Sequence, residues 1–199
     1  MFKDKNEIEK ILTALSEQLE ASGAGLIEML VCGGSALNVL GYISRTTKDI
    51  DVVAFIDKAK DGSTVITKAE PLKPELLNAA SKVRKDFNLP EDWINSGPAS
   101  VMDFGLPEGL MDRVKTQKFG KNLIIHFLSR YDQIHFKLYA VIDQGMGKHY
   151  EDLMVLKPTS KELEQAGKWC MTHDVSKEFK ESLLDFLIKI GFEDAAKKL

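Results

Sequence analysis

A short apolar run, two glycines and a second strand that opens on an Asp-x-Asp pair constrain this chain more than any other feature. Residues 26–32 (LIEMLVC) have the length and composition of a buried strand. Gly33 and Gly34 follow at once, and the next residues, SALNVLGY, are typical of a short helix. The run 49–56 (DIDVVAFI) is rich in β-branched and aromatic residues and predicts a second strand. The chain therefore folds around a strand, a glycine turn, a helix and a strand.

The second of these strands carries two carboxylates on one face. Residues i and i+2 of a strand point to the same side, so Asp49 and Asp51 lie side by side while Ile50 turns into the core. Two carboxylates held this close repel each other, and burying them without a counter-charge is costly. A divalent cation removes the conflict. Mg²⁺ is commonly held by one or two carboxylates together with substrate phosphates.

The glycine turn adds the elements of a phosphate site. Gly33 and Gly34 allow the backbone to approach a ligand closely, and the start of the following helix directs free N–H groups outward. Ser35 adds a hydroxyl donor. Each motif is weak by itself, since Gly-Gly-Ser is commonly a simple turn and Asp-x-Asp is commonly a solvated strand edge. Together they predict a site for the phosphates of a metal–nucleotide complex.

The remaining pattern places strands first and helices last. A helix is expected over 5–22, and a strand hairpin over 114–120 and 122–129. Residues 57–100 are less regular, with a turn at Asp61-Gly62, a helical patch near 74–87 and several prolines, so they are interpreted as an insertion. From Tyr131 onward the pattern is helical. The expected fold class is α+β, with a mixed sheet flanked by helices in residues 1–130 and a helical region in 131–199.

Composition narrows the function classes. The 199 residues suit one domain, or one domain with a small helical appendage, and the apolar fraction of 44% is above that of disordered chains. With 27 basic and 30 acidic residues the net charge is −3, which argues against coating nucleic acid by charge alone. No apolar run is long enough for a membrane helix, and the N-terminus lacks the features of a signal peptide. Cys32 and Cys170 are too few for a disulfide framework, so we expect a cytoplasmic protein without membrane contact.

Residues 33–52, GGSALNVLGYISRTTKDIDV, resemble the signature of the DNA polymerase β-like nucleotidyltransferase superfamily. In that signature Gly-Gly or Gly-Ser opens a helix and Asp-x-Asp follows on the next strand. The Arg-Thr-Thr ahead of the Asp pair, and the downstream stretches RYDQIHFKLYAVID and KHYEDLMVLKPT, look like the minimal bacterial nucleotidyltransferases related to abortive-infection toxins. The resemblance implies a polymerase β-like fold, a nucleoside triphosphate as substrate, and Mg²⁺ or Mn²⁺ as cofactor.

The resemblance also implies roles for individual residues. Gly34 and Ser35, with Gly33 before them, would hold the β- and γ-phosphates, and Asp49 and Asp51 would ligate the metal ion.

Three further residues are implicated by the resemblance, each with a simpler alternative. Arg45 would contact phosphate or brace the Asp strand, or it is an ordinary surface arginine. Lys137 would contact the triphosphate, or it is a solvated lysine on the polar face of its helix. Asp152 would line the site, or it pairs with Lys148 one helical turn away.

The chain departs from the family pattern at a third carboxylate, which two-metal members carry on a later strand. The run 122–129 (NLIIHFLS) offers only His126 there, and Asp103 lies in a loop-like segment. If neither serves, the enzyme uses one metal with a different base or has lost transfer activity. The histidines show no shared ligand spacing, and Trp93 and Trp169 are interpreted as packing residues rather than platforms for stacked bases.

The expected function is the metal-dependent transfer of a nucleoside monophosphate from a triphosphate to a hydroxyl acceptor, in RNA, a protein or a small molecule. The toxin-like resemblance favours RNA or protein, and it would make a small antitoxin protein a partner. The alternative is a catalytically reduced protein of the same fold that binds a nucleotide or a partner. A polynucleotide would be held by a local surface, and Lys115, Lys118 and Lys121 are the first candidates.

Overall fold

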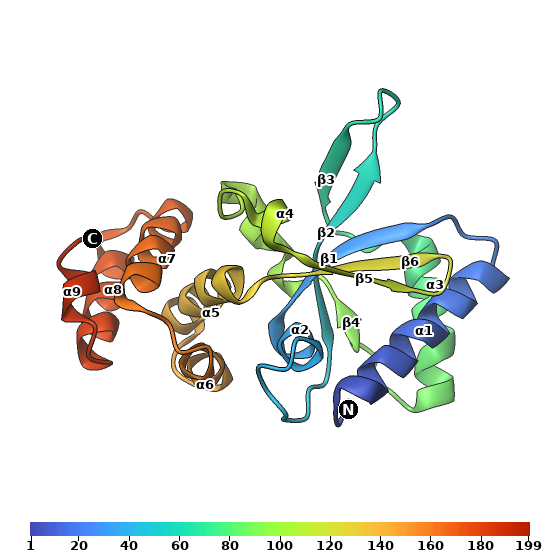
Figure 1. The fold of residues 1–199 in the computed structure, drawn as a ribbon, viewed down its shortest axis with the longest axis horizontal. Coiled ribbons are helices and arrows are strands. Elements are labelled where there is room, and N and C mark those ends of the chain that lie inside the picture. The colour runs from blue at the N-terminus through green and yellow to red at the C-terminus, as the bar shows by residue number, and fades with distance from the viewer. The chain divides into compact units, whose positions relative to one another are not determined.

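The computed structural model describes residues 1–199, which form two compact units (Figure 1). Residues 1–103 and 111–128 make up the first, called the sheet unit below. Residues 104–110 and 129–199 make up the second, called the helical unit. No helix combines the length and the apolar character that crossing a membrane requires. Cys32 and Cys170 are both buried, and neither forms a disulfide bond.

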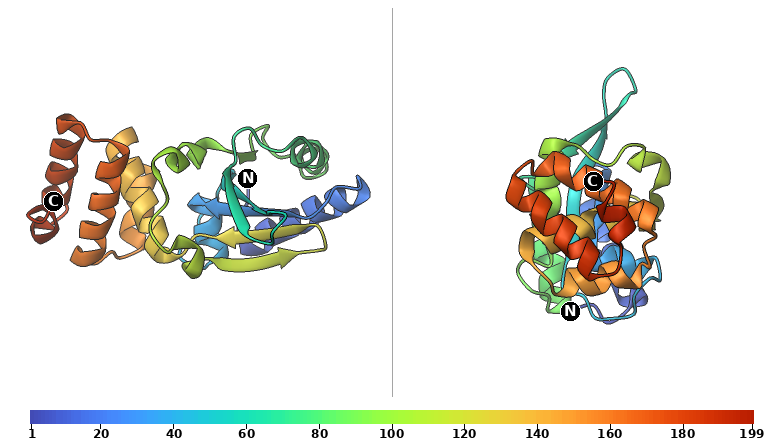
Figure 2. Two further views of the ribbon diagram at one scale, coloured as in Figure 1. Left: turned by 90° about the horizontal axis from the view of Figure 1, so that it is seen from above. Right: turned by 90° about the vertical axis from the view of Figure 1, so that its left-hand side faces the viewer.

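The sheet unit is built on one mixed six-stranded sheet, with the strand order β3-β2-β1-β6-β5 and β4 beside β2. Its strands are β1 (Ile27–Cys32), β2 (Ile50–Lys58), β3 (Thr64–Lys68), β4 (Ile94–Asn95), β5 (Lys115–Phe119) and β6 (Leu123–Phe127). β1 is antiparallel to β2 and parallel to β6. The β2–β3 hairpin projects from the rest of the unit (Figures 1 and 2). The expected fold class, a mixed sheet flanked by helices and followed by a helical region, is confirmed.

The register of the central strands decides which side chains meet. Cys32, the last residue of β1, pairs with Asp51 of β2. On the other side of β2, Asp51 pairs with Asn95 of β4. Asp51, the second aspartate of the Asp-x-Asp pair, therefore lies between β1 and β4. Cys32, just before the glycine turn, is its neighbour on one side, and Asn95, from much later in the chain, is its neighbour on the other.

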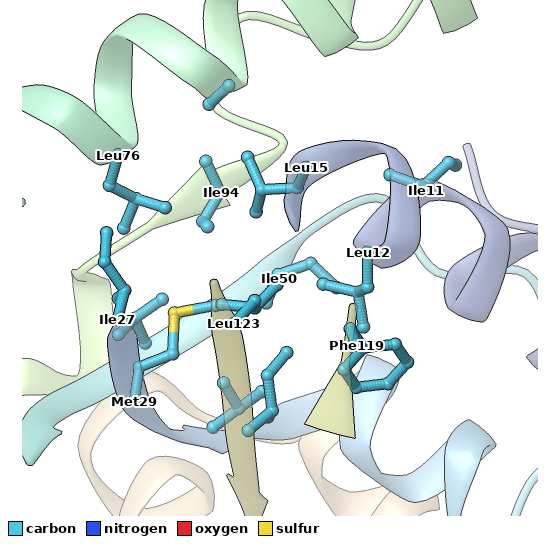
Figure 3. Close-up of a cluster of buried hydrophobic side chains, with 14 of the residues drawn as sticks. Ile11, Leu12, Leu15, Ile27, Met29, Ile50, Leu76, Ile94, Phe119 and Leu123 are labelled. Atoms are coloured by element: carbon cyan, nitrogen blue, oxygen red, sulfur yellow. The ribbon is translucent and has the colours of Figure 1, made fainter. Parts of the chain in front are cut away.

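One face of the sheet is covered by α1 (Lys5–Ala21) and α3 (Pro74–Phe87), which contact each other. Helix α1 begins at Asp4, whose side chain accepts a hydrogen bond from the Glu7 amide. Figure 3 shows the core that results, with side chains from both helices meeting those of the strands: Ile11, Leu12, Leu15, Ile27, Met29, Ile50, Leu76, Ile94, Phe119 and Leu123. Full burial of one such side chain stabilises the fold by about 1.5–3 kcal/mol.

Residues 57–100, interpreted as an insertion, contribute to the sheet and to the main core, and the helical patch expected near 74–87 is α3. They supply β3, α3 and β4, and four α3 side chains, Leu76, Ala79, Ala80 and Val83, belong to the main core. Trp93 is almost fully buried in the same core, and its indole N–H donates to the Ala80 carbonyl oxygen at 3.2 Å. The prolines that made this segment look irregular lie outside the strands, and Pro74 is the first residue of α3.

The other expected elements of this unit are present with small shifts. The helix predicted over 5–22 is α1, and the predicted hairpin is β5–β6, closed by Gly120, Lys121 and Asn122. The short helix α2 (Gly33–Val39) begins at the glycines themselves rather than at Ser35. The segment 97–104 forms a 3₁₀ helix, and α4 (Leu110–Arg113) is a single turn.

The helical unit contains α5 (Arg130–Gln144), α6 (Lys148–Val155), α7 (Ser160–His173), α8 (Lys177–Lys189) and α9 (Glu193–Ala196). Arg130, the first residue of α5, forms hydrogen bonds that link α5 to α6 and α7. Its guanidinium donates to the carbonyl oxygens of Leu156 and Lys157, both at 2.7 Å, and to the Glu162 carboxylate at 2.6 Å. Because those carbonyls end α6 and Glu162 lies in the first turn of α7, one arginine at the start of α5 fixes the α6–α7 junction.

Glu162 also completes the cap of α7. Thr159 and Glu162 exchange hydrogen bonds between side chain and backbone in a capping box. Burial of Glu162 alone would raise the pKa of its carboxyl group, but the hydrogen bonds from Arg130 and Thr159 outweigh burial and hold this pKa below its ordinary value. A carboxylate with a lowered folded-state pKa contributes stability above its unfolded-state pKa and loses it as the pH falls through the folded-state value.

The variant Glu162→Gln should therefore destabilise the chain at pH 7 by about 1–2 kcal/mol, because it keeps the cap but removes the charge that Arg130 contacts. The gap between wild type and variant should shrink as the pH falls below the ordinary glutamate pKa of about 4.3 and through the lowered folded-state pKa of Glu162, because protonation removes the charge that the variant lacks. Urea unfolding followed by circular dichroism at pH 7, 5 and 3.5 measures both effects. A gap that is independent of pH would contradict this account of Glu162.

Candidate functional site

The glycine turn lies directly against the Asp-x-Asp strand. Gly33 has φ of +78°, in the left-handed region that favours glycine. A Cβ atom at Gly33 would collide with the Asp51 carboxylate. Backbone conformation and space therefore both require glycine here, and the absence of a side chain is what lets the start of α2 and the second aspartate come together.

Gly34 approaches the loop that precedes β2. A Cβ atom on Gly34 would lie 3.0 Å from Thr47 Oγ1 and 3.6 Å from Arg45 Nη2. The two glycines thus form a cradle bordered by Asp51 on one side and by Arg45 and Thr47 on the other. Arg45 is half-buried beside this cradle, and its contact with a phosphate stays a prediction.

Two contacts hold the loop in this position. The Asn38 side chain, from α2, donates to the Arg45 carbonyl oxygen at 2.9 Å. Phe2 and Thr47 exchange backbone hydrogen bonds of 2.7 and 3.0 Å, and the Phe2 ring is fully buried edge-on to Trp93. The N-terminus therefore anchors the loop that carries Arg45, a role that nothing in the local sequence around Phe2 indicates.

The two aspartates occupy the expected stretch, although Asp49 precedes β2 by one residue rather than lying within it. Both are half-buried. Asn95 Nδ2 donates to Asp51 Oδ1 at 3.2 Å, and Asn95 Oδ1 accepts from the Gly97 amide at 2.8 Å. The second bond fixes which way the amide points, so Asn95 presents its donor to Asp51. Sequence reasoning missed Asn95 because the pairing of β4 with β2 is a long-range contact.

Ser35 is fully buried, and its Oγ has no hydrogen-bond partner in the protein. A buried hydroxyl without a partner is uncommon in folded proteins and requires an explanation. At the first turn of α2, next to the cradle, a ligand oxygen would supply the missing partner. Two carboxylates, a cradle without side chains and this hydroxyl together fit a hard cation with phosphate groups.

The residues considered for a third carboxylate position have other partners. Asp103 accepts from Lys68 Nζ at 2.9 Å, and this hydrogen bond raises the pKa of Lys68. His126 bonds to Thr116 Oγ1 at 2.8 Å and to Glu28 Oε2 at 3.1 Å. No group of three or more His, Cys, Asp or Glu side chains suited to a metal ion is present. Asp51 is therefore the carboxylate that borders the cradle, and Asp49 lies two residues before it in the chain.

Lys137 and Asp152 lie in the helical unit and pair with each other. Lys137 Nζ is 2.9 Å from Asp152 Oδ2, and the two side chains are 7% and 1% exposed. Both simpler alternatives are therefore wrong: Lys137 is not a solvated lysine, and the Asp152 carboxylate contacts Lys137 across α5 and α6 instead of Lys148. Their role in triphosphate binding stays a prediction.

The three hairpin lysines do not form a common patch. Lys115 and Lys118 are three positions apart on β5 and so point to opposite faces of the sheet. Lys121 bonds to Glu20 Oε1 at 2.7 Å. A shared surface for a polynucleotide backbone is therefore not built from these residues.

The variant Lys137→Met should lose about 3–5 kcal/mol of stability, because it leaves the Asp152 charge buried without its cation. The double variant Lys137→Met/Asp152→Leu should recover most of that loss, since it removes both charges. Lys148→Met, at the exposed position that sequence reasoning paired with Asp152, serves as the control and should stay within about 0.5 kcal/mol of wild type. Urea unfolding gives all three values, and a Lys137→Met loss below about 1 kcal/mol would refute a structural role for the pair.

Comparison with known proteins adds a family to this geometry. Residues 9–165 match the model of a family described as a nucleotidyltransferase of unknown function (DUF6036). The match covers the glycine cradle, both aspartates, and the Lys137–Asp152 pair. Searches of curated proteins and of solved structures find no significant match. The nucleotidyltransferase resemblance of residues 33–52 is therefore confirmed at the level of the family, and the chain belongs to this nucleotidyltransferase family.

Proposed function

We propose that this protein transfers a nucleoside monophosphate from a nucleoside triphosphate to a hydroxyl acceptor and releases pyrophosphate. Mg²⁺ or Mn²⁺ would be held by Asp49 and Asp51. The observation that carries the proposal is the buried Ser35 hydroxyl without a partner, at a glycine cradle that packs against the Asp51 carboxylate. Family membership supports a nucleotide as substrate.

Each residue of the cradle has a different proposed role in binding the triphosphate. Gly33 and Gly34 leave room for phosphate oxygens next to the backbone, and the Ser35 hydroxyl can donate to one of them. The Arg45 guanidinium, planar and always charged, can contact a second phosphate. A divalent ion, when bound, supplies positive charge that offsets the charge developing on the phosphates.

Asn95 is the positioning residue in this proposal. Its amide oxygen accepts from the Gly97 N–H, and its amide N–H donates to Asp51, so Asn95 fixes the orientation of that carboxylate. Hydrogen bonds of this kind orient metal-binding carboxylates, and their loss typically lowers metal affinity or activity 10- to 100-fold.

The acceptor is proposed to be a hydroxyl of RNA or of a protein. In the toxin-like members that residues 33–52 resemble, such a transfer would inactivate an essential molecule of the cell, and an antitoxin protein would be the partner that restrains it. Growth arrest on induced expression, relieved by replacing Asp49 and Asp51, is the outcome that a toxin role requires.

The second candidate function is nucleotide or partner binding without transfer. One observation favours it: Asp49 and Asp51 are joined by no further His, Cys, Asp or Glu in a metal-binding group. A protein of this kind would use the same cradle to hold a nucleotide and would lack the carboxylate that activates the attacking hydroxyl in two-metal relatives.

The double variant Asp49→Asn/Asp51→Asn should lower transfer at least about 100-fold, because stabilisation of transition-state charge by a metal is worth several kcal/mol. The assay incubates each labelled triphosphate with Mg²⁺ and total cellular RNA or protein and follows label in the acceptor.

The matched control for that experiment is Asp57→Asn/Asp61→Asn, which removes two carboxylates at the far end of β2 and in the turn after it. Asp57 contacts Lys73 and Asp61 contacts Ser63, so neither belongs to the cradle. Label transfer that persists in the Asp49/Asp51 variant would overturn the metal assignment. Triphosphate binding without transfer by the wild type would select the second candidate.

The variant Asn95→Ala should raise the Mg²⁺ concentration for half-maximal transfer roughly tenfold or more, because Asp51 loses the donor that orients it. Asn122→Ala is a matched control, since Asn122 Nδ2 donates to the Ala24 carbonyl oxygen at 2.6 Å elsewhere in the same unit. An equal Mg²⁺ requirement in the two variants would show that Asn95 serves stability alone.

A further inference from the structure

The helical unit contains a pocket that the proposed transfer reaction does not use. Its volume is about 400 Å³, within the range of roughly 300–1,000 Å³ typical of small-molecule sites. Its walls combine aromatic rings with side chains that carry hydrogen-bonding groups: Pro107, Glu108, Tyr131, His135, Gln165, Lys168, Trp169 and Thr172.

Helical periodicity brings these residues together. Gln165, Lys168, Trp169 and Thr172 follow the i, i+3, i+4, i+7 spacing and so form one stripe along α7. Tyr131 and His135 are one turn apart on α5. The pocket thus lies where these two helices meet residues 107–108 of the segment 104–110.

The rings of the pocket are held in fixed orientations. Trp169 Nε1 donates to the Gly105 carbonyl oxygen at 3.0 Å, and the Phe136 ring stacks on the indole at a centroid distance of 5.4 Å and an angle of 13°. His135 Nδ1 donates to the Tyr131 carbonyl oxygen at 2.9 Å, and the two rings are 4.5 Å apart. Because these rings are already ordered, little side-chain conformational entropy is lost when a ligand stacks on them.

Trp169 therefore differs from Trp93, although the sequence suggested a packing role for both. Trp93 is 1% exposed in the core of the sheet unit. Trp169 is half-buried and lines the pocket. The His173 ring also contacts the indole, at a centroid distance of 4.1 Å, so the surface that Trp169 offers to a planar ligand is the part that lines the pocket.

The polar groups narrow the class of planar ligand. Gln165 is exposed at the pocket and its amide both donates and accepts, as does the edge of a nucleobase. Lys168 Nζ pairs with Glu164 Oε1 at 2.6 Å, and Glu108 also lines the pocket, so charged groups of both signs lie at its rim. A purely apolar ligand would use none of these groups.

We propose that this pocket binds a nucleobase, stacked on the ring surfaces of Tyr131 and Trp169 and contacted at its edge by Gln165. The choice of a nucleobase among planar rings rests on the proposed nucleotidyltransferase function. The base can come from a free nucleotide or from an unpaired position of an RNA acceptor, and the test below separates the two sources.

The test uses tryptophan fluorescence of the full chain, with EDTA present so that no divalent ion contributes to binding at the aspartates. The protein is titrated with each of the four nucleoside monophosphates and with a short single-stranded oligoribonucleotide. Trp169→Phe leaves Trp93 as the sole indole, so the signal of Trp169 is the difference from wild type. Stacking should quench this signal with saturation. Quenching by mononucleotides identifies a free nucleotide as the source, and quenching by the oligonucleotide alone identifies RNA.

Two pocket variants and two controls decide the assignment. Tyr131→Ala and Gln165→Ala should weaken binding, the first by about tenfold or more, since base stacking on an aromatic side chain is worth that much. Tyr150→Ala and Gln144→Ala, which change the same residue types elsewhere in the helical unit, should bind as wild type does. Gln165 and Gln144 are exposed, so their variants test the pocket even if Tyr131→Ala is unstable.

The outcomes separate this inference from the proposed function. Quenching that is absent, or that is equal in the pocket variants and their controls, overturns the pocket assignment even if transfer is observed. Quenching that is lost in the pocket variants and retained in Asp49→Asn/Asp51→Asn supports it even if the protein transfers no nucleotide.

Discussion

Cys32 pairs with Asp51 across β1 and β2, and this register brings the backbone at Gly33 against a carboxylate with no room for a side chain between them. The rest of the site depends on that contact. It places the first turn of α2, with the buried Ser35 hydroxyl, beside the aspartates, and it leaves the loop before β2 to close over Gly34. Any larger residue at position 33 would push the helix and strand apart and separate the phosphate-binding elements from the metal-binding ones.

Charges that are only partly exposed to solvent organise both units. In the helical unit, Lys137 and Asp152 neutralise each other in the interior, and Arg130 with Glu162 fixes the junction of α6 and α7. Replacing one partner of either pair leaves the other charge poorly solvated and without its counter-charge. Single replacements therefore lower the stability of the fold. In the sheet unit, the Asp51 carboxylate accepts a hydrogen bond from Asn95 and borders the glycine cradle.

Local pattern was sufficient to predict most elements. The apolar spacing of residues 5–22 predicted α1, and the β-branched run after Asp49 predicted β2, because periodicity and composition act within one segment. The contribution of residues 57–100 to the sheet and the core could not be predicted, for the opposite reason. β3 is a half-exposed strand, β4 is two residues long, and α3 is amphipathic but preceded by prolines, so their place in the core depends on partners elsewhere in the chain. Asn95 was not predicted as a site residue for the same reason, since only the pairing of β4 with β2 brings it to Asp51.

The sequence by itself determined that the glycine turn and the Asp-x-Asp strand would meet, because a strand, a tight turn and an adjacent strand allow few other arrangements. It also determined the family, since residues 9–165 match the family model. Tertiary structure decided the rest. Thr47 and Phe2 complete the loop through backbone pairing, Lys137 finds Asp152 rather than solvent, and Trp169 lines a pocket instead of a core. Each of these depends on contacts between residues far apart in the chain, and such contacts are set by packing and burial of the whole fold rather than by local pattern.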